Sequence, residues 1–371
     1  MLIGVPREIK VHEYRVGMTP ASVREAVAHG HAVWVERAAG AGIGCTDDDY
    51  ARAGARMVDA PDEVFAGCDL IVKVKEPQAA ERAMLRPGQV LFTYLHLAAD
   101  PLQGRELVAR GAVCIAYETV TAPGGGLPLL APMSEVAGRM AIQAGAACLE
   151  RERGGMGVLL GGVPGVAPAR VVILGAGTVG TNAAAMAVGA GAQVVVLDRS
   201  IDALRRLDAR FGARVITRHA DRDAIEQEVL QADLVVGAVL VPGAAAPRLV
   251  GRETVARMKR GAVVVDVAID QGGCFETSRP TTHAEPTYVV DGVVHYCVAN
   301  MPGGVARTSA YALNHATLPF VLALAGQGWR AAAAADPHLR AGLNVALGKV
   351  VHPAVADALG LPYVPPDTLL A

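Results

Sequence analysis

Four polar residues of types that can do chemistry stand in apolar or glycine-rich surroundings: Arg15, Lys75, His96 and Asp270. Lys75 and His96 follow apolar runs typical of strands, Asp270 follows a third such run, and Arg15 lies in the loop after the first one. In open parallel sheets ligands bind at the carboxyl ends of the strands, so all four fall on the expected ligand edge. Two cations, an imidazole and a carboxylate there could bind an anionic ligand and exchange protons with it.

Each of these residues also has a purely structural explanation. A histidine beside a strand is commonly a hydrogen-bonded structural residue, and a Lys or Arg at a strand end is commonly a solvated charge. An Asp before glycines is typical of a turn. Asp266, four residues before Asp270 on the same run, is an acidic candidate at nearly the same strand end. Spacing alone therefore leaves the choice open.

A glycine-rich loop indicates a dinucleotide site. Gly175-Ala176-Gly177-Thr178-Val179-Gly180 has the GxGxxG pattern, follows the apolar run Val171–Leu174 and precedes a small-residue helix predicted over Thr178–Gly189. The first glycine permits a tight turn, the second lets backbone N–H groups approach a pyrophosphate, and the third lets the helix pack against the strand. The helix N-terminus favours the negative charge.

Asp198 ends the next apolar run, as expected of the residue that binds the ribose of the cofactor. A carboxylate there accepts hydrogen bonds from ribose hydroxyls and repels the 2′-phosphate of NADP, so we expect NAD. Arg199 is a complication, because an arginine in this region could receive that phosphate.

Composition excludes several classes of protein. The 371 residues suggest two domains, with 52% hydrophobic and 4% aromatic residues and a net charge of −2, so neither nucleic acid nor a membrane surface is an expected partner. The N-terminus has no secretory signal pattern, and the most apolar stretches are too short to span a bilayer. Six scattered cysteines indicate reduced thiols in a cytoplasmic protein, and ten histidines without ligand spacing give no reason to propose a metal.

Strands and helices alternate along the chain, which predicts an α/β fold with parallel sheets. We expect two lobes with a cleft between them. Residues 131–305 would form the Rossmann dinucleotide-binding domain, and 1–130 with 306–371 a discontinuous α/β substrate domain. Helices are expected from about Ser134 to Glu150 and from Val305 to Leu324. The expected strands are Leu2–Val5, Ala32–Val35, Leu70–Val74, Val90–Thr93, Val113–Ala116, Val171–Leu174, Gln193–Leu197, Ala213–Ile216, Leu234–Ala238 and Ala262–Val267.

Over essentially its whole length the chain resembles the NAD-dependent alanine dehydrogenases. The segments that carry this resemblance are Gly4–Lys10 through Arg15-Val16, Lys73–Pro77, Tyr94–Leu97, Gly175–Asn182, Asp266–Gly273, Ser278–Thr282 and Tyr296–Pro302. Such enzymes interconvert L-alanine with pyruvate and ammonia by transfer of a hydride between Cα and the nicotinamide.

The resemblance implies a role for each of the four residues. Arg15 and Lys75 match the residues that hold pyruvate, and a guanidinium fork suits a carboxylate. His96 matches the acid/base histidine, whose ordinary pKa near neutrality suits proton exchange in both directions. Asp270 matches the catalytic aspartate, which would stabilise the cationic imine or orient water.

The resemblance also assigns residues to the cofactor and implies a homohexamer. Two departures from relatives are Ala203, where some have a basic residue at the adenosine end, and Ala306, near which a proline is common. Neither involves the four chemical residues. Besides the glycine loop and Asp198, the expected cofactor residues are Ser134, Val239, Leu240, Val267, Ala268, Ile269, Asp270, Arg279, Val298, Ala299, Asn300 and Met301.

Three alternatives remain open. The nucleotide-binding component of a transhydrogenase shares this architecture, but there we would not expect the Lys-Glu-Pro and Tyr-Leu-His-Leu segments intact. A saccharopine-type amino-acid dehydrogenase would need a larger substrate pocket. A catalytically silent NAD-responsive regulator would need only the fold and the cofactor site, and the full set of four chemical residues argues against it.

Overall fold

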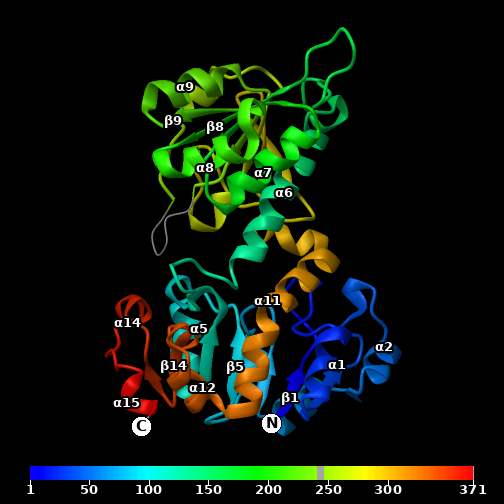
Figure 1. The fold of residues 1–371 in the computed structure, drawn as a ribbon, viewed down its shortest axis with the longest axis vertical. Helices are drawn as coiled ribbons and strands as arrows, with labels where there is room; N and C mark the ends of the chain where they lie inside the picture. The colour runs from blue at the N-terminus through cyan, green and yellow to red at the C-terminus, as the bar shows by residue number, and fades with distance from the viewer. Residues whose placement is uncertain (240–245, 371) are drawn as a thin grey trace. The chain divides into compact units, whose positions relative to one another are not determined.

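The computed structural model describes residues 1–239 and 246–370, which divide into two compact units (Figure 1). The first unit contains Met1–Met133 and Val305–Ala371, and the second contains Ser134–Gly304. Among the described residues, no helix is both long enough and apolar enough to cross a membrane.

The first unit is built on one eight-stranded sheet. Its strands are β1 (Leu2–Val5), β2 (Ala32–Glu36), β3 (Arg56–Val58), β4 (Leu70–Val72), β5 (Val90–Thr93), β6 (Val113–Ala116), β14 (Leu343–Ala346) and β15 (Lys349–Val350). The order across the sheet is β15-β14-β6-β5-β4-β1-β2-β3, with β1 to β6 parallel to one another, β14 antiparallel to β6, and β15 antiparallel to β14. From β1 the chain therefore runs to one edge, and from β4 to the other, as in doubly wound folds.

The helices of the first unit cover this sheet and include the C-terminal part of the chain. Thr19 caps α1 and accepts the Ser22 N–H, with Pro20 at the first helical position. Ala306 begins α11, a position where a proline also fits a helix. The helices are α1 (Pro20–Ala28), α2 (Asp47–Arg52), α3 (Pro61–Gly67), α4 (Ala79–Met84), α5 (Pro101–Arg110), α11 (Ala306–Gln327), α12 (Trp329–Ala335), α13 (Pro337–Arg340), α14 (Pro353–Leu359) and α15 (Asp367–Leu370), with short 3-10 turns η1 (Ala41–Ile43), η2 (Leu97–Ala99) and η3 (Tyr117–Thr119).

The second unit contains a seven-stranded sheet with the Rossmann order. Its strands are β7 (Arg170–Leu174), β8 (Gln193–Asp198), β9 (Val215–His219), β10 (Leu234–Gly237), β11 (Val263–Asp266), β12 (Thr287–Val290) and β13 (Val293–Tyr296). They are ordered β12-β13-β11-β10-β7-β8-β9, with only β12 antiparallel among them. Counted along the chain, the six parallel strands have the 3-2-1-4-5-6 order of dinucleotide-binding folds.

Alternate residues of the central strands face two helical layers. In β7, Ile173 packs in a cluster with Ala183 of α7, whereas Val172 packs in a cluster with Val229 of α9. Burial on both faces explains the nearly continuous apolar runs of these strands. The helices are α6 (Ala131–Cys148), α7 (Thr178–Gly189), α8 (Ile201–Phe211), α9 (Arg222–Gln231) and α10 (Arg252–Ala256), with 3-10 turns η4 (Arg151–Arg153), η5 (Gly212–Arg214), η6 (Val267–Gln271) and η7 (Met301–Val305).

The predicted α/β class with a Rossmann lobe and a second α/β lobe is confirmed. Two strand predictions are wrong in their bounds by two residues or more. The strand expected over Leu70–Val74 ends at Val72, and the one expected over Ala213–Ile216 is Val215–His219. After α11 the chain also contributes β14 and β15 to the first sheet, where β14 pairs with β6 and β15 pairs with β14.

Glu228 of α9 provides a test of how the second unit is held together. Its carboxylate pairs with Arg170 of β7 at 2.5 Å and with Arg218 of β9 at 2.6 Å. Burial alone raises the pKa of the Glu228 carboxyl, but hydrogen bonds and charges from the two arginines lower it below its ordinary value of 4.5. A carboxyl with a lowered pKa stabilises the fold above its unfolded pKa, and this stabilisation is lost as the pH falls through the folded pKa.

We therefore expect Glu228→Gln to lower the free energy of unfolding by about 1–3 kcal/mol at neutral pH. The difference from the wild type should shrink between neutral and acidic pH, as the pH falls through the lowered pKa of Glu228 and protonation makes its side chain neutral, like that of glutamine. Urea titrations at the two pH values measure this, and an equal difference at both would contradict it.

Candidate functional site

The candidate residues of the first unit follow the carboxyl ends of its central strands. Arg15 follows β1, Lys75 follows β4 and His96 follows β5. Because β1 and β4 are neighbours from which the chain runs to opposite edges, this is the switch point where open α/β sheets bind ligands. The loop after β1 also passes close to the end of β4, since a Cβ at Gly17 would overlap the Val72 carbonyl oxygen.

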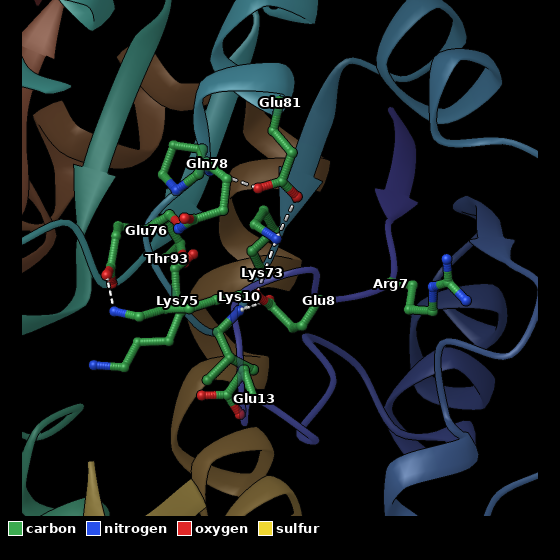
Figure 2. Close-up of polar contacts among 12 residues, drawn as sticks. Arg7, Glu8, Lys10, Glu13, Lys73, Lys75, Glu76, Gln78, Glu81 and Thr93 are labelled. Atoms are coloured by element: carbon green, nitrogen blue, oxygen red, sulfur yellow. Dashed lines mark hydrogen bonds and ion pairs between the residues drawn. The ribbon is translucent and has the colours of Figure 1, made fainter. Parts of the chain in front are cut away.

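The two lysines after β4 have different surroundings (Figure 2). Lys73 is fully buried, and its ammonium pairs with Glu8 at 3.0 Å and with Glu81 at 2.7 Å. Burial alone lowers the pKa of an ammonium, but the two carboxylates raise the pKa of Lys73. Lys75 is half-buried, and its side chain leads away from this ion group. Lys73 is thus a structural cation, which leaves Lys75 as the candidate for a ligand.

Arg15 is buried and paired with a carboxylate from its own loop. Glu13 accepts hydrogen bonds from Nε at 2.7 Å and from Nη2 at 2.5 Å, so it occupies one fork of the guanidinium. Nη1 donates to the Met133 sulfur at 3.0 Å. A thioether is a weak acceptor, so a carboxylate approaching the Nη1 side would be the stronger partner. Glu13 therefore fixes the orientation of the Arg15 guanidinium, which remains a candidate for binding an anion.

His96 stands at the end of β5 with an exposed ring. Its backbone is left-handed, with φ of 51°, and its ring stacks on Tyr94 with centroids 5.8 Å apart. Glu118, after β6, accepts the His96 N–H at 2.6 Å and lies 3.9 Å from Nδ1. Glu118 therefore holds the backbone of His96, whose exposed imidazole carries one donor and one acceptor nitrogen when neutral.

Tyr94 links the histidine to the arginine. Its ring stacks on His96, and its hydroxyl donates to the Leu129 carbonyl at 2.5 Å. Burial raises the pKa of the Tyr94 phenol, and the nearby charge of Arg15 opposes that effect. Tyr94 is therefore a neutral donor between the two candidates.

In the second unit the three glycines of the loop after β7 have different environments. Gly175 has φ of 110°, which side chains rarely adopt, and a Cβ at Gly180 would overlap the Gly175 carbonyl oxygen. A Cβ at Gly177 would meet nothing within 4 Å, so this backbone is open to a ligand. Gly177 is also the N-cap of α7, and its exposed surroundings at a helix N-terminus suit a pyrophosphate. The loop fits a dinucleotide.

Asp198 fastens the end of β8 to this loop. Its Oδ2 accepts the Ala176 N–H at 2.6 Å and its Oδ1 accepts the Ser200 N–H at 2.7 Å. A carboxylate has about four acceptor positions, so two remain in principle for ribose hydroxyls. Arg199 beside it is exposed, whereas Ala203 is buried in the core of the unit. The environment of Ala203 explains why a small apolar residue fits there.

The structure distinguishes the two acidic candidates after β11. Asp266 is fully buried and accepts hydrogen bonds from the Ala268 N–H at 3.2 Å, the Cys274 N–H at 2.8 Å and the Ser278 hydroxyl at 2.5 Å. Burial raises the pKa of the Asp266 carboxyl, and these donors oppose the rise. Asp270 is exposed in η6. Asp266 therefore organises the segment that presents Asp270.

Most other predicted cofactor residues lie at the same carboxyl edge of the second sheet. This holds for Val239 after β10, for Val267, Ala268 and Ile269 in η6 after β11, and for Val298, Ala299, Asn300 and Met301 after β13. Leu240 lies outside the described residues.

Ser134 and Arg279 lie off the strands. Ser134 is on α6, one turn before Gly138, whose Cβ position would overlap the Val179 carbonyl oxygen at the start of α7. The Arg279 guanidinium lies 4.1 Å above the Tyr288 ring. Within residues 1–239 and 246–370, no group of three or more His, Cys, Asp or Glu side chains could hold a metal ion.

The sequence reasoning missed the carboxylates that surround the candidates. Glu13 and Glu118 contact Arg15 and His96, and Glu8 and Glu81 surround Lys73. One signal was present: a lysine within the apolar run Ile71–Val74 must be paired when buried, which calls for acidic partners. Which acids these are depends on long-range contacts that no local pattern carries.

Comparisons with known proteins match the whole chain. The model of the alanine dehydrogenase/PNT N-terminal domain matches residues 4–137, and that of the C-terminal domain matches 141–353. An alanine dehydrogenase of Halomonas elongata is 61% identical over 370 residues, covering 100% of both chains.

Solved structures give the same result. A structure of L-alanine dehydrogenase has a TM-score of 0.94 and 52% identity, covering 97% of this chain and 99% of its own. A transhydrogenase structure from Sinorhizobium meliloti is more distant, with a TM-score of 0.81 and 25% identity, covering 95% of this chain and 100% of its own. Together with the two family models, these matches show that the chain belongs to the alanine dehydrogenase/PNT family.

Proposed function

We propose that this chain is an NAD-dependent alanine dehydrogenase that interconverts L-alanine with pyruvate and ammonia. The observation that carries the proposal is that Arg15 and Lys75 follow the two strands of the switch point and His96 follows the neighbouring strand β5, in a chain 61% identical over its full length to an alanine dehydrogenase. By the same likeness we propose a homohexamer that works in the cytoplasm.

The cofactor is held by the second unit. Residues Gly175 to Gly180 and the start of α7 would bind the pyrophosphate through backbone N–H groups, and Asp198 would accept hydrogen bonds from a ribose. The remaining predicted cofactor residues at the carboxyl edge would line the nicotinamide half. When bound, NAD supplies the hydride acceptor for oxidation at Cα of alanine.

The first unit binds the substrate and moves its protons. The Lys75 ammonium and the Nη1 side of Arg15 would pair with the substrate carboxylate, and Lys75 could also polarise the carbonyl oxygen of pyruvate. His96 would accept a proton from the substrate nitrogen or oxygen and return it in the reverse reaction. Asp270, which belongs to the second unit, would stabilise positive charge on the substrate nitrogen or orient the attacking water.

The proposed activity is tested by the absorbance of NADH formed with NAD and a panel of amino acids. We expect alanine to exceed valine, leucine and saccharopine in kcat/KM by about tenfold or more, because extra methylenes are poorly accepted by a site built for one methyl group. Equal rates with larger amino acids, or none with alanine, would contradict the proposal. Measurable hydride exchange between NADH and an NADP analogue without alanine turnover would favour the transhydrogenase alternative.

The roles of His96 and Asp270 are tested by substitution. We expect His96→Ala to lower kcat about 100- to 10,000-fold, because the proton acceptor is lost. Asp270→Asn should lower kcat about 100-fold or more, because charge stabilisation is lost. His29→Ala is the matched control, since His29 is exposed at the end of α1. Near-normal turnover in either site variant would disprove the role of that residue.

The glycine loop offers a matched pair for cofactor binding. Gly177→Ala should fold within about 1 kcal/mol of the wild type, because its Cβ meets nothing, yet it should weaken NADH binding about tenfold or more. Gly180→Ala should also destabilise the fold by about 1–3 kcal/mol, because its Cβ overlaps the Gly175 carbonyl. NADH fluorescence titration and thermal melts measure both effects. Wild-type affinity in Gly177→Ala would show that the pyrophosphate lies elsewhere.

A further inference from the structure

Two carboxylates hold the segment that carries Lys75, one on each side of it (Figure 2). On the N-terminal side, Glu8 Oε1 accepts the Val74 N–H at 2.7 Å. On the C-terminal side, Glu81 Oε2 accepts the Gln78 N–H at 2.7 Å, within the capping box of α4. The backbone is therefore fixed one residue before Lys75 and three residues after it.

Lys73 connects the two carboxylates. Its ammonium lies 3.0 Å from Glu8 Oε2 and 2.7 Å from Glu81 Oε1, so each carboxylate binds the ammonium with one oxygen and a backbone N–H with the other. All three residues are buried, with exposed fractions of 8% or less. The group of Glu8, Lys73 and Glu81 is called the buried triad below.

Further contacts fix the main chain within this segment. The Thr93 hydroxyl donates to the Lys75 carbonyl at 2.9 Å, and the Tyr117 hydroxyl donates to the Lys73 carbonyl at 2.9 Å. Lys10 pairs with the Glu76 carboxylate. Lys75 is therefore a half-buried side chain on a closely held backbone.

We propose that the buried triad positions Lys75 for the substrate. Burying three charges carries a large desolvation cost, and apolar residues of similar volume commonly give equal or greater stability. What apolar residues cannot supply is acceptors for the Val74 and Gln78 N–H groups together with a cation that fixes both acceptors. Glu8, Lys73 and Glu81 are positioning residues for the Lys75 ammonium. This inference rests on the proposed binding of the substrate by Lys75.

Glu81→Gln tests the triad with little change in shape. An amide oxygen can still accept the Gln78 N–H, but the neutral side chain holds the Lys73 ammonium more weakly. We expect kcat/KM for pyruvate to fall about 10- to 100-fold, mainly through a higher KM, as misplacement of a binding group by about 1 Å does. The Kd of NADH should not change, because the dinucleotide loop is in the second unit. An unchanged KM for pyruvate would overturn the proposal.

Glu228→Gln is the matched control. It also neutralises a buried carboxylate between cations, but in the second unit and away from Lys75. It should lower thermal stability without raising the KM for pyruvate. If both variants raised KM equally, the effect would be general loosening of the fold and the proposal would be wrong. Should Glu81→Gln fail to fold, Glu81→Asp keeps the charge on a shorter side chain and carries the same expectation.

A double-mutant cycle separates positioning from stability. In a Lys75→Ala background, Glu81→Gln should cause no further loss of kcat/KM, because the group it positions is absent. If the losses of kcat/KM in the two single variants multiply in the double variant, Glu81 acts independently of Lys75 and the proposal is wrong.

A spectroscopic readout needs no turnover. The chain has five lysines, Lys10, Lys73, Lys75, Lys259 and Lys349, so reductive ¹³C-methylation gives few NMR signals, and Lys75→Ala assigns that of Lys75. Glu81→Gln should shift or broaden the Lys75 signal, and Glu228→Gln should not. If the wild-type chain does not oxidise alanine but Glu81→Gln still shifts the Lys75 signal, the proposed function is wrong and the positioning role stands. If the wild-type chain oxidises alanine but Glu81→Gln leaves the Lys75 signal unchanged, only the positioning role is wrong.

Discussion

The buried N–H groups just beyond the strand ends impose the constraint on which the rest of the structure depends. Beyond the last hydrogen bond that a strand makes within its sheet, the chain continues as a loop. The buried N–H groups of that loop must find acceptors other than water, because water does not reach them. Glu8, after β1, serves the segment after β4, and Glu118, after β6, serves the segment after β5. Asp198, at the end of β8, serves the loop after β7. In each case a carboxylate after one strand holds the chain after the neighbouring strand.

This arrangement explains how loops can carry a precise site. Functional groups lie on loops at the carboxyl edge because only there can they face a ligand, and loops are mobile unless their polar backbone is held. A charged acceptor gives stronger hydrogen bonds than a neutral one, so a few carboxylates can fix several loops. Asp266 follows the same principle within its own segment, where it holds three N–H groups and a hydroxyl and leaves Asp270 exposed.

The sequence predicted the central architecture better than its edges. The runs Val90–Thr93 and Val113–Ala116 are strands at the predicted bounds because burial on both faces demands apolar residues throughout. The edge hairpin of β12 and β13 was missed, although its Asp291-Gly292 turn, with both φ values positive, is a strong hairpin signal. Of the two strands that flank that turn, β12 alternates exposed and half-buried residues, and β13, although buried, contains His295, so the hydrophobic pattern is weaker than in the central strands.

The site was predictable where the function of a motif follows directly from the physical properties of its own residues. The glycine loop is such a motif, whereas the choice between Asp266 and Asp270 required burial, which spacing does not give. Lys73 and Lys75 are equally conspicuous in the sequence, and only the acids from distant segments separate the structural cation from the candidate one. Partners such as Glu8 and Glu118 come from other strands, so a reading of local patterns cannot assign them.

We propose that loops held by carboxylates present Lys75 and Arg15 to the substrate while Lys73 stays in the interior. A crystal structure of the chain with NADH and pyruvate tests it most directly. We expect the pyruvate carboxylate to lie within hydrogen-bonding distance of Lys75 and of the Nη1 side of Arg15, with the Glu8 and Glu118 contacts intact. Pyruvate bound to Lys73, or away from the carboxyl ends of β1 and β4, would contradict it.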